Sequence, residues 1–269
     1  MRDKLLFCLF LLSIQFSVNA TSKQEVTIYA EENYRPYTWV ENGQLKGIYV
    51  DILKQAFKKM EGYHVKLKAV PWERGLHMLE KGEAFALFPP YYLPTHRPYI
   101  SPYSEPIFRE KTILVCRKGI FTENRKRWPE DFYGLTIGQS SGYLMGGNKF
   151  IEAVKLGKMK VSESLRTGQN LLMVATGRID CYINDELAVK TEELMLSLQP
   201  RYKKLVDNLD NGFTISEEHG YLAFSNVNED NYPYKNNFVT QFNLAIKQMK
   251  DNGDYDAIVN RYTGAESRE

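Results

Sequence analysis

The feature that most constrains the fold is a regular change in hydrophobic spacing along the chain. Apolar and polar residues alternate in short segments such as residues 26–30 and 64–70, whereas apolar residues recur every three or four positions in residues 49–60. The first spacing favours strands and the second favours helices. Turn residues separate the segments, most clearly Asn42-Gly43, a strong hairpin signal. Strands that alternate with helices indicate an α/β protein.

This alternation occurs twice. Residues 26–88 have the pattern of a βαβαβ unit, and residues 135–185 repeat it without a visible residue-level repeat. A further strand is predicted within residues 217–228, and two helices follow it, the first with Phe238, Phe242 and Met249 on one face. The length exceeds one average domain, so we predict two lobes or one large α/β unit.

The N-terminus has the pattern of a secretory signal peptide. Arg2 and Lys4 precede an apolar run over residues 5–16, and small residues follow at residues 18 and 20. We predict a signal peptide over residues 1–20 and a soluble mature protein. Cys8 lies within the leader, which leaves Cys116 and Cys181. These two cysteines are compatible with a disulfide in an oxidising compartment and equally with two buried thiols.

Composition excludes several functional classes. A formal net charge of +2 is too close to neutral for a typical nucleic-acid-binding surface. The four histidines are scattered and stand at no metal-ligand spacing from one another or from a cysteine. We therefore expect no metal or other cofactor. The 18 tyrosines are numerous enough to suggest a site lined by rings, although tyrosines also serve as packing.

Arg97 stands out in the segment PPYYLPTHRPYISPYSEPIF, residues 89–108, among prolines and aromatic residues. An arginine in such surroundings often lies at the surface and stacks on a ring. The alternative is a ligand anchor, because the planar guanidinium can donate two parallel hydrogen bonds to a carboxylate.

Between residues 26 and 262, the chain resembles the bacterial extracellular solute-binding proteins of family 3, which serve polar amino acid ABC transporters. Six segments in the family's order carry the resemblance: Tyr34-Arg35-Pro36-Tyr37, similar to Tyr-x-Pro-Phe; Gly47-Ile48-Tyr49-Val50-Asp51; Trp72; Arg97 with Tyr103-Ser104-Glu105-Pro106-Ile107; Gly177-Arg178-Ile179-Asp180 through Asp185; and Met249 through Tyr262. Each segment alone is a weak signal, but their common order makes coincidence improbable.

The resemblance implies the type II periplasmic-binding-protein-like fold, in which two crossing strands join two α/β lobes around a ligand cleft that closes by a hinge. The first part of lobe 1 would span residues 21–110, lobe 2 residues 111–220, and the C-terminal part of lobe 1 residues 221–269. The crossings would lie near residues 108–112 and 218–223.

The resemblance also implies a ligand site. Arg97 would bind a carboxylate, and Asp185, at the end of a strand in lobe 2, would receive an ammonium group or cap the helix that follows. Trp72 and Tyr34 would form the walls, and Glu31 matches an acidic position that meets basic ligand side chains. Ser141 and Gly142 would contribute backbone N–H groups.

One segment departs from the family pattern. Where members that bind amino acids carry a run of serine and threonine that meets the α-ammonium, this chain has Pro89, Pro90 and Tyr92. Proline has neither an N–H nor a hydroxyl group, so backbone carbonyls and the Tyr92 hydroxyl remain. This departure allows a modified amino acid, a small peptide-like amine or another carboxylate as the ligand.

The function implied is a monomeric periplasmic solute-binding protein, not an enzyme, that delivers a small carboxylate-bearing ligand to an inner-membrane ABC permease. The ligand would be an amino acid or an amino acid derivative. One alternative is a cyclohexadienyl dehydratase-like enzyme, with His96 and Glu31 as the nearest acid or base candidates. Another is a ligand-sensing partner of a membrane receptor.

Overall fold

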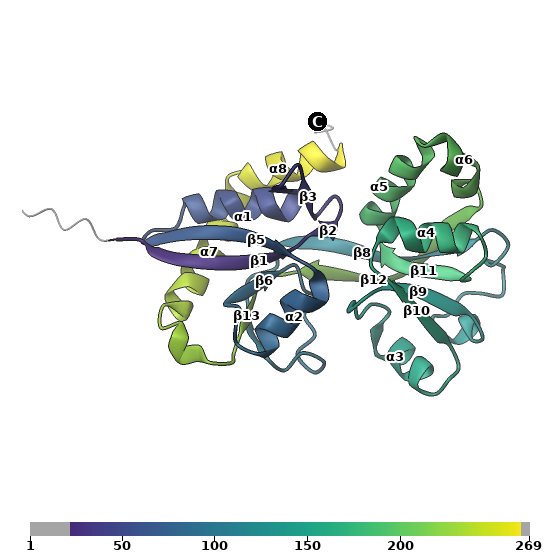
Figure 1. Cartoon of the computed structure of the whole chain (residues 1–269), viewed down its shortest axis with the longest axis horizontal. Helices are drawn as coiled ribbons and strands as arrows, with labels where there is room; N and C mark the ends of the chain where they lie inside the picture. Colours follow the sequence, from purple (N-terminus) through teal and green to yellow (C-terminus); the bar gives the residue numbers. More distant parts are fainter. Residues whose placement is uncertain (1–21, 265–269) are drawn as a thin grey trace, which may run out of the picture.

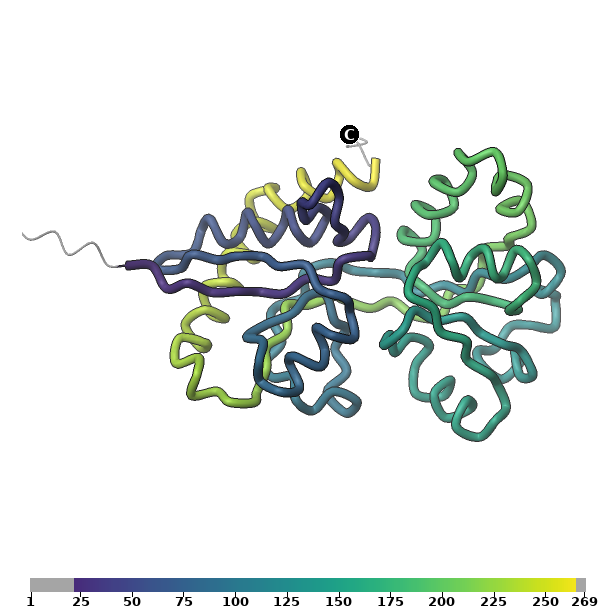
Figure 2. Tube along the Cα trace, viewed as in Figure 1, coloured from purple at the N-terminus to yellow at the C-terminus, as the bar shows by residue number. Residues whose placement is uncertain are grey.

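The computed structural model describes residues 22–264, which form two lobes (Figure 1). Each lobe contains a five-stranded sheet, and the trace runs between the lobes through two neighbouring segments (Figure 2). This arrangement confirms the predicted α/β, type II periplasmic-binding-protein-like fold. The predicted signal peptide lies outside the described residues. Within the described part of the chain, no helix has both the length and the apolar character needed to cross a membrane.

Lobe 1 is the lobe built on the sheet of order β5-β1-β6-β13-β7. Its strands are β1 Gln24–Glu31, β5 Tyr63–Val70, β6 Ala86–Phe88, β7 Ile100–Tyr103 and β13 Ala223–Ser225, and its helices are α1 Ile48–Lys58, α2 Trp72–Glu80, α7 Lys235–Asp251 and α8 Asp254–Thr263. A small sheet holds β2 Asn33–Tyr34, β3 Thr38–Glu41 and β4 Gln44–Lys46. Asn42 and Gly43 form the β3–β4 turn with positive φ, as the sequence predicts.

Lobe 2 is built on the sheet of order β10-β9-β11-β8-β12. Its strands are β8 Phe108–Arg117, β9 Thr136–Ser140, β10 Lys160–Ser164, β11 Cys181–Asp185 and β12 Leu209–Gly220, and its helices are α3 Gly147–Lys155, α4 Thr167–Ala175, α5 Glu186–Ser197 and α6 Pro200–Val206. Short 3-10 turns occur at Glu130–Phe132 in this lobe and at Glu229–Asn231 in lobe 1. In the order of each sheet, the first three strands pair parallel to one another, and the last two pairings are antiparallel.

The strands β8 and β12 lie side by side in the connection between the lobes (Figure 1). They pair antiparallel, and Phe108 stands opposite Gly220 at the end of the ladder nearest lobe 1. A Cβ atom at Gly220 would lie 1.9 Å from the Tyr49 hydroxyl oxygen. Only glycine therefore allows β12 to pass this close to lobe 1.

The sequence pattern predicts one strand within residues 217–228, but the structure contains two. β12 ends at Gly220 and β13 begins at Ala223. Between them, Tyr221 donates its backbone N–H to the Pro90 carbonyl, and Leu222 donates to the Ser104 hydroxyl. The chain exchanges its partner strand at this point, which local hydrophobic spacing does not reveal.

The cores follow the predicted faces. In α7, Phe238, Phe242 and Met249 are fully buried, and α1 packs against α7 and α8. In lobe 2, Cys116 of β8 and Cys181 of β11 stand opposite each other and form a disulfide. Of the two states that the sequence allows for these cysteines, the structure contains the bonded one.

Candidate functional site

A pocket lies between the lobes, where the loops after β1, β6 and β9 meet the start of α2. Lobe 1 contributes Glu31, Tyr34, Trp72, Pro89, Pro90, Tyr91, Leu93 and Arg97, and lobe 2 contributes Tyr143, Leu144 and Met145. Most of these side chains are aromatic or aliphatic, and a few polar groups converge among them, as is typical of small-molecule sites.

Arg97 is the cation of this pocket, and it is 4% exposed. One guanidinium nitrogen, Nη2, donates to the Gly142 carbonyl of lobe 2 at 3.0 Å, and the group lies 5.4 Å from the centre of the Trp72 ring. Burial lowers the pKa of Arg97, but an arginine remains charged at neutral pH. Within residues 22–264, no carboxylate forms an ion pair with Arg97 at 4.0 Å or less.

Glu31 ends β1 at the same pocket. Its carboxyl is buried and accepts a hydrogen bond of 2.7 Å from the Tyr143 hydroxyl of lobe 2. Burial raises the pKa of Glu31 to about 8, and the Tyr143 hydrogen bond and the charge of Arg97 oppose that rise. At pH 7 the side chain is therefore mostly a neutral acid.

Aromatic side chains form the pocket walls. Tyr143 meets Tyr34 edge to face, with 5.7 Å between the ring centroids, and meets Trp72 at 5.9 Å. The Trp72 indole N–H also donates to the Gly142 carbonyl at 3.2 Å. The structure thus brings Arg97, Trp72, Tyr34 and Glu31 to one pocket.

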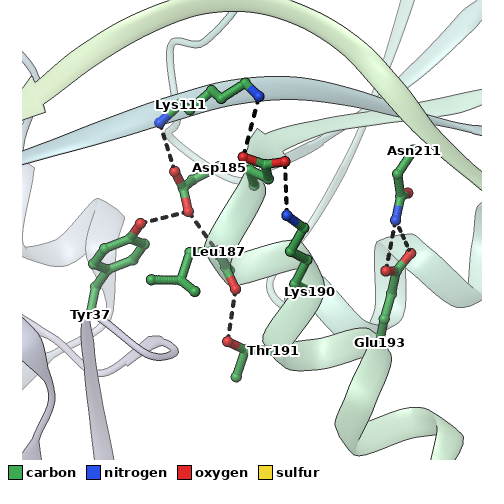
Figure 3. Close-up of polar contacts among 10 residues, drawn as sticks. Tyr37, Lys111, Asp185, Leu187, Lys190, Thr191, Glu193 and Asn211 are labelled. Atoms are coloured by element: carbon green, nitrogen blue, oxygen red, sulfur yellow. Dashed lines mark hydrogen bonds and ion pairs between the residues drawn. The ribbon is translucent and has the colours of Figure 1, made fainter. Parts of the chain in front are cut away.

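Asp185 belongs to lobe 2 and does not line this pocket. It ends β11, caps α5 by accepting the Ala188 N–H at 2.9 Å, and is 1% exposed. The Tyr37 hydroxyl of lobe 1 donates to the same oxygen at 2.7 Å, and the Lys111 backbone N–H donates to the other at 2.9 Å (Figure 3). Of the two expected roles, helix capping is the one that these contacts display.

The structure places Tyr92 away from the pocket. This side chain is 59% exposed and packs against Tyr103, with 4.9 Å between ring centroids. Its neighbour Tyr91, which forms an isolated β-bridge with Gly220, is buried and lines the pocket instead. The departure at Pro89 and Pro90 does bring both prolines into the pocket lining.

Gly142 contributes its carbonyl group rather than an N–H group. The carbonyl accepts from both Arg97 and Trp72. The N–H of Ser141 donates to the Ser164 carbonyl at 3.0 Å, so this donor is already used, and Ser141 lines a neighbouring groove. Of the two N–H groups expected to face a ligand carboxylate, that of Ser141 is therefore engaged within lobe 2, whereas Gly142, where φ is +74°, turns its carbonyl to Arg97.

Sequence reasoning missed Glu110, a buried carboxyl on β8. It accepts hydrogen bonds from three tyrosine hydroxyls of lobe 1, those of Tyr34 at 2.5 Å, Tyr49 at 2.5 Å and Tyr91 at 2.7 Å. Burial, followed by the nearby Asp185 charge, raises the pKa of Glu110 to about 8. The alternation of β8 places Glu110 on the face of Leu114 and Cys116, which is the signal that could have identified it.

The sequence model of one protein family, the bacterial extracellular solute-binding proteins, family 3, matches residues 26–265 of this chain. Among solved structures, a histidine kinase sensor domain with similarity to periplasmic binding proteins has a TM-score of 0.72 at 15% identity, covering 90% of this chain and 97% of its own. A structure from work on glutathione import via GshT and the cystine ABC importer of Streptococcus mutans has a TM-score of 0.71 at 18% identity, covering 90% and 95%.

A third solved structure is an ancestral amino acid-binding protein described as a precursor of cyclohexadienyl dehydratase. Its TM-score is 0.65 at 18% identity, and the match covers 88% of this chain and 94% of the other. No curated protein sequence matches the chain. At these identities the solved structures establish a shared fold.

Proposed function

This chain belongs to the bacterial extracellular solute-binding proteins of family 3, and we propose that it captures a small carboxylate-bearing ligand in the periplasm for import by an inner-membrane ABC permease. The ligand is an amino acid or an amino acid derivative, and the protein acts as a monomer. The observation that carries this proposal is Arg97, a buried guanidinium in an aromatic pocket between two lobes.

The pocket supports carboxylate capture on chemical grounds. A buried cation with no carboxylate partner within the described chain is costly unless an anion reaches it. A carboxylate is the anion whose geometry suits a guanidinium best. Because Arg97 belongs to lobe 1 and its present acceptor to lobe 2, a ligand bound at Arg97 also touches the interface that closes over it.

The test measures thermal unfolding of the purified protein, refolded from denaturant to remove any carried ligand, against amino acids, their derivatives and simple carboxylates. A ligand at about 100 times its dissociation constant adds about 2.7 kcal/mol of stability. Arg97→Ala should abolish the shift, because removing a buried charge-assisted hydrogen bond costs about 2–5 kcal/mol of binding energy. Arg97→Lys keeps the charge without the planar fork and should retain only weak binding.

Arg74→Ala is the matched control, since Arg74 lies exposed on α2 of the same lobe. It should bind every ligand as the unaltered protein does. Equal shifts for the Arg97→Ala and unaltered proteins would remove Arg97 from the site, and a panel in which no carboxylate shifts the unfolding temperature would overturn the proposal.

A dehydratase-like activity is a second candidate, and Glu31 is the observation that favours it. A buried carboxyl with a pKa of about 8 beside Arg97 can hold or release a proton near neutral pH. Incubation with prephenate-like cyclic acids, followed by ultraviolet absorbance for an aromatic product, tests it. Turnover that Glu31→Gln abolishes would replace the binding role with an enzymatic one.

A further inference from the structure

We propose that one corner of lobe 2, formed by the end of α5 and by α6, docks on an anionic lipid surface. This α5–α6 corner comprises residues 194–206, none of which lines the pocket between the lobes. Both helices lie on the face of the lobe 2 sheet opposite α3 (Figure 1). The inference goes beyond the proposed function, because it concerns the surface that holds the protein rather than the ligand between its lobes.

Three large apolar side chains of the α5–α6 corner are exposed to solvent. Leu194 is 61% exposed, Met195 is 39% exposed and Leu198 is 75% exposed. Leu194 and Leu198 are four positions apart, so they share one face at the end of α5, and Met195 stands three positions before Leu198. Covering these side chains would remove apolar surface from water, and a cluster of this kind marks a surface that meets a partner.

The chain continues from these apolar residues into a basic helix. α6 contains Arg201, Lys203 and Lys204 and no acidic residue, and all three cations are exposed. In the described residues 22–264, none of the three has a carboxylate oxygen within 4.0 Å. Their charges are therefore not used by an ion pair and can meet an anionic partner.

The acidic residues that precede the corner are held against other elements of lobe 2. Glu193 accepts hydrogen bonds of 2.7 and 2.9 Å from the Asn211 side chain of β12 (Figure 3). A Glu192 carboxylate oxygen lies 3.0 Å from the position of a Cβ atom at Gly168 of α4. Asp207 follows α6 and is exposed. The α5–α6 corner itself carries three positive charges and no negative one.

This combination fits a bilayer surface. The apolar residues of α6, Tyr202, Leu205 and Val206, are partly exposed, and no residue of the helix is fully buried. Basic side chains beside exposed apolar ones match the bilayer interface, where anionic headgroups lie directly above acyl chains. A second copy of this chain fits less well, because two corners with three cations each would repel one another.

The experiment measures co-sedimentation of the purified mature protein, without the predicted signal peptide of residues 1–20, with lipid vesicles. The probe is vesicles of phosphatidylglycerol and phosphatidylcholine in equal parts, and vesicles of phosphatidylcholine alone are the uncharged comparison. Partitioning into the anionic vesicles should be about tenfold stronger or more, and it should weaken as salt rises to about 0.5 M, because salt screens the attraction. Equal partitioning into both kinds of vesicle, or into neither, would overturn the proposal.

A pair of leucine substitutions tests the apolar part. Leu194→Ser/Leu198→Ser should lower partitioning into the anionic vesicles about tenfold, because its contact with the acyl chains is lost. The matched control is Leu244→Ser, since Leu244 is 55% exposed on α7 of lobe 1, and it should partition as the unaltered protein does. An equal loss in the control would show that the α5–α6 corner is not the docking surface.

A pair of lysine substitutions tests the charge. Lys203→Gln/Lys204→Gln should lower partitioning about tenfold and make it less sensitive to salt. Lys54→Gln/Lys58→Gln changes the net charge equally through two exposed lysines on α1 of lobe 1, and it should keep the partitioning of the unaltered protein. If both lysine pairs lose the same amount, net charge rather than the corner controls binding, and the proposal fails.

Circular dichroism and unfolding temperature show whether each variant is folded. Sedimentation velocity without lipid tests the other occupant, a second copy of the chain. A dimer that Leu194→Ser/Leu198→Ser dissociates would assign the corner to self-association and overturn docking on lipid. None of these measurements requires a ligand between the lobes, so their failure leaves the proposed function standing.

Discussion

At the scale of single residues, the buried carboxyls of this protein are held by tyrosine hydroxyls. Glu31, Glu110 and Asp185 are each at most 7% exposed, and each accepts from at least one tyrosine. In every case burial raises the pKa above its ordinary value. The tyrosine hydrogen bonds oppose this rise, because a donated O–H stabilises the ionised carboxylate, so burial is the stronger of the two effects.

The Glu110 carboxyl should make stability depend on pH. Its pKa is about 8 in the folded protein and near 4.5 ordinarily, so the unfolded chain ionises first as pH rises. Stability should fall between about pH 4.5 and 8. Because Glu110→Gln stays neutral, its free energy of unfolding relative to the unaltered protein should rise by about 4 kcal/mol across this window.

Urea unfolding of both proteins at pH 4 and pH 8 checks this. Near pH 4 the two should be nearly equally stable, because glutamine matches the neutral acid in shape and retains an acceptor oxygen. A difference of the same size at both pH values would show that Glu110 is not protonated in the folded state.

At the scale of elements, β8 connects several parts of the molecule. It pairs with β11 and β12, carries Glu110 toward the tyrosines of lobe 1, and holds Cys116 against Cys181. Its course from the connection into the sheet of lobe 2 couples the site to the core of that lobe.

The disulfide should stabilise lobe 2 substantially. It closes a loop of 65 residues in sequence separation, and removing the crosslink should lower the free energy of unfolding by about 2–4 kcal/mol. Guanidinium unfolding of the Cys116→Ala/Cys181→Ala variant measures the loss. A reductant should lower the stability of the unaltered protein similarly and leave the variant unchanged, and a reductant effect on the variant would point to a cause other than this bond.

At the scale of the whole molecule, the lobes meet through hydrogen bonds on both sides of the pocket. Arg97 and Trp72 reach Gly142, Tyr143 reaches Glu31, and Tyr37 reaches Asp185. These contacts can form only when the lobes are close together, so the pocket and the arrangement of the lobes are linked.

Gly142→Ala should hinder the approach of the lobes. A Cβ atom there would lie 2.8 Å from Glu73 Cγ and 3.2 Å from Trp72 Cδ1. Ligand affinity should fall about tenfold, a cost of about 1.4 kcal/mol, and small-angle scattering should show a larger radius of gyration at saturating ligand than for the unaltered protein.

Gly157→Ala is the control for backbone strain. Its φ of +68° is close to the +74° of Gly142, but a Cβ atom there would have nothing within 4 Å. This variant should compact with ligand as the unaltered protein does. If the two glycine variants scatter alike, contact between the lobes at Gly142 does not control closure.

The sequence by itself determined the fold class and part of the site. Apolar residues recur at every second position in strands and about every 3.6 positions in helices. This spacing is a local property, so β1, α1 and α7 could be recognised from their own residues. The family resemblance placed Arg97, Trp72, Tyr34 and Glu31 in one site, and the pocket contains all four. Their roles toward a ligand remain predictions.

Only the tertiary structure decided how each side chain is engaged. Tyr37 and Asp185 are 148 positions apart and Tyr34 and Glu110 are 76 apart, so no local pattern relates them. For the same reason, the sequence could not show that Tyr91 rather than Tyr92 faces inward, or that Gly142 turns its carbonyl to Arg97. Hydrophobic spacing reports which face of an element is buried, whereas hydrogen-bond partners depend on how separate elements meet.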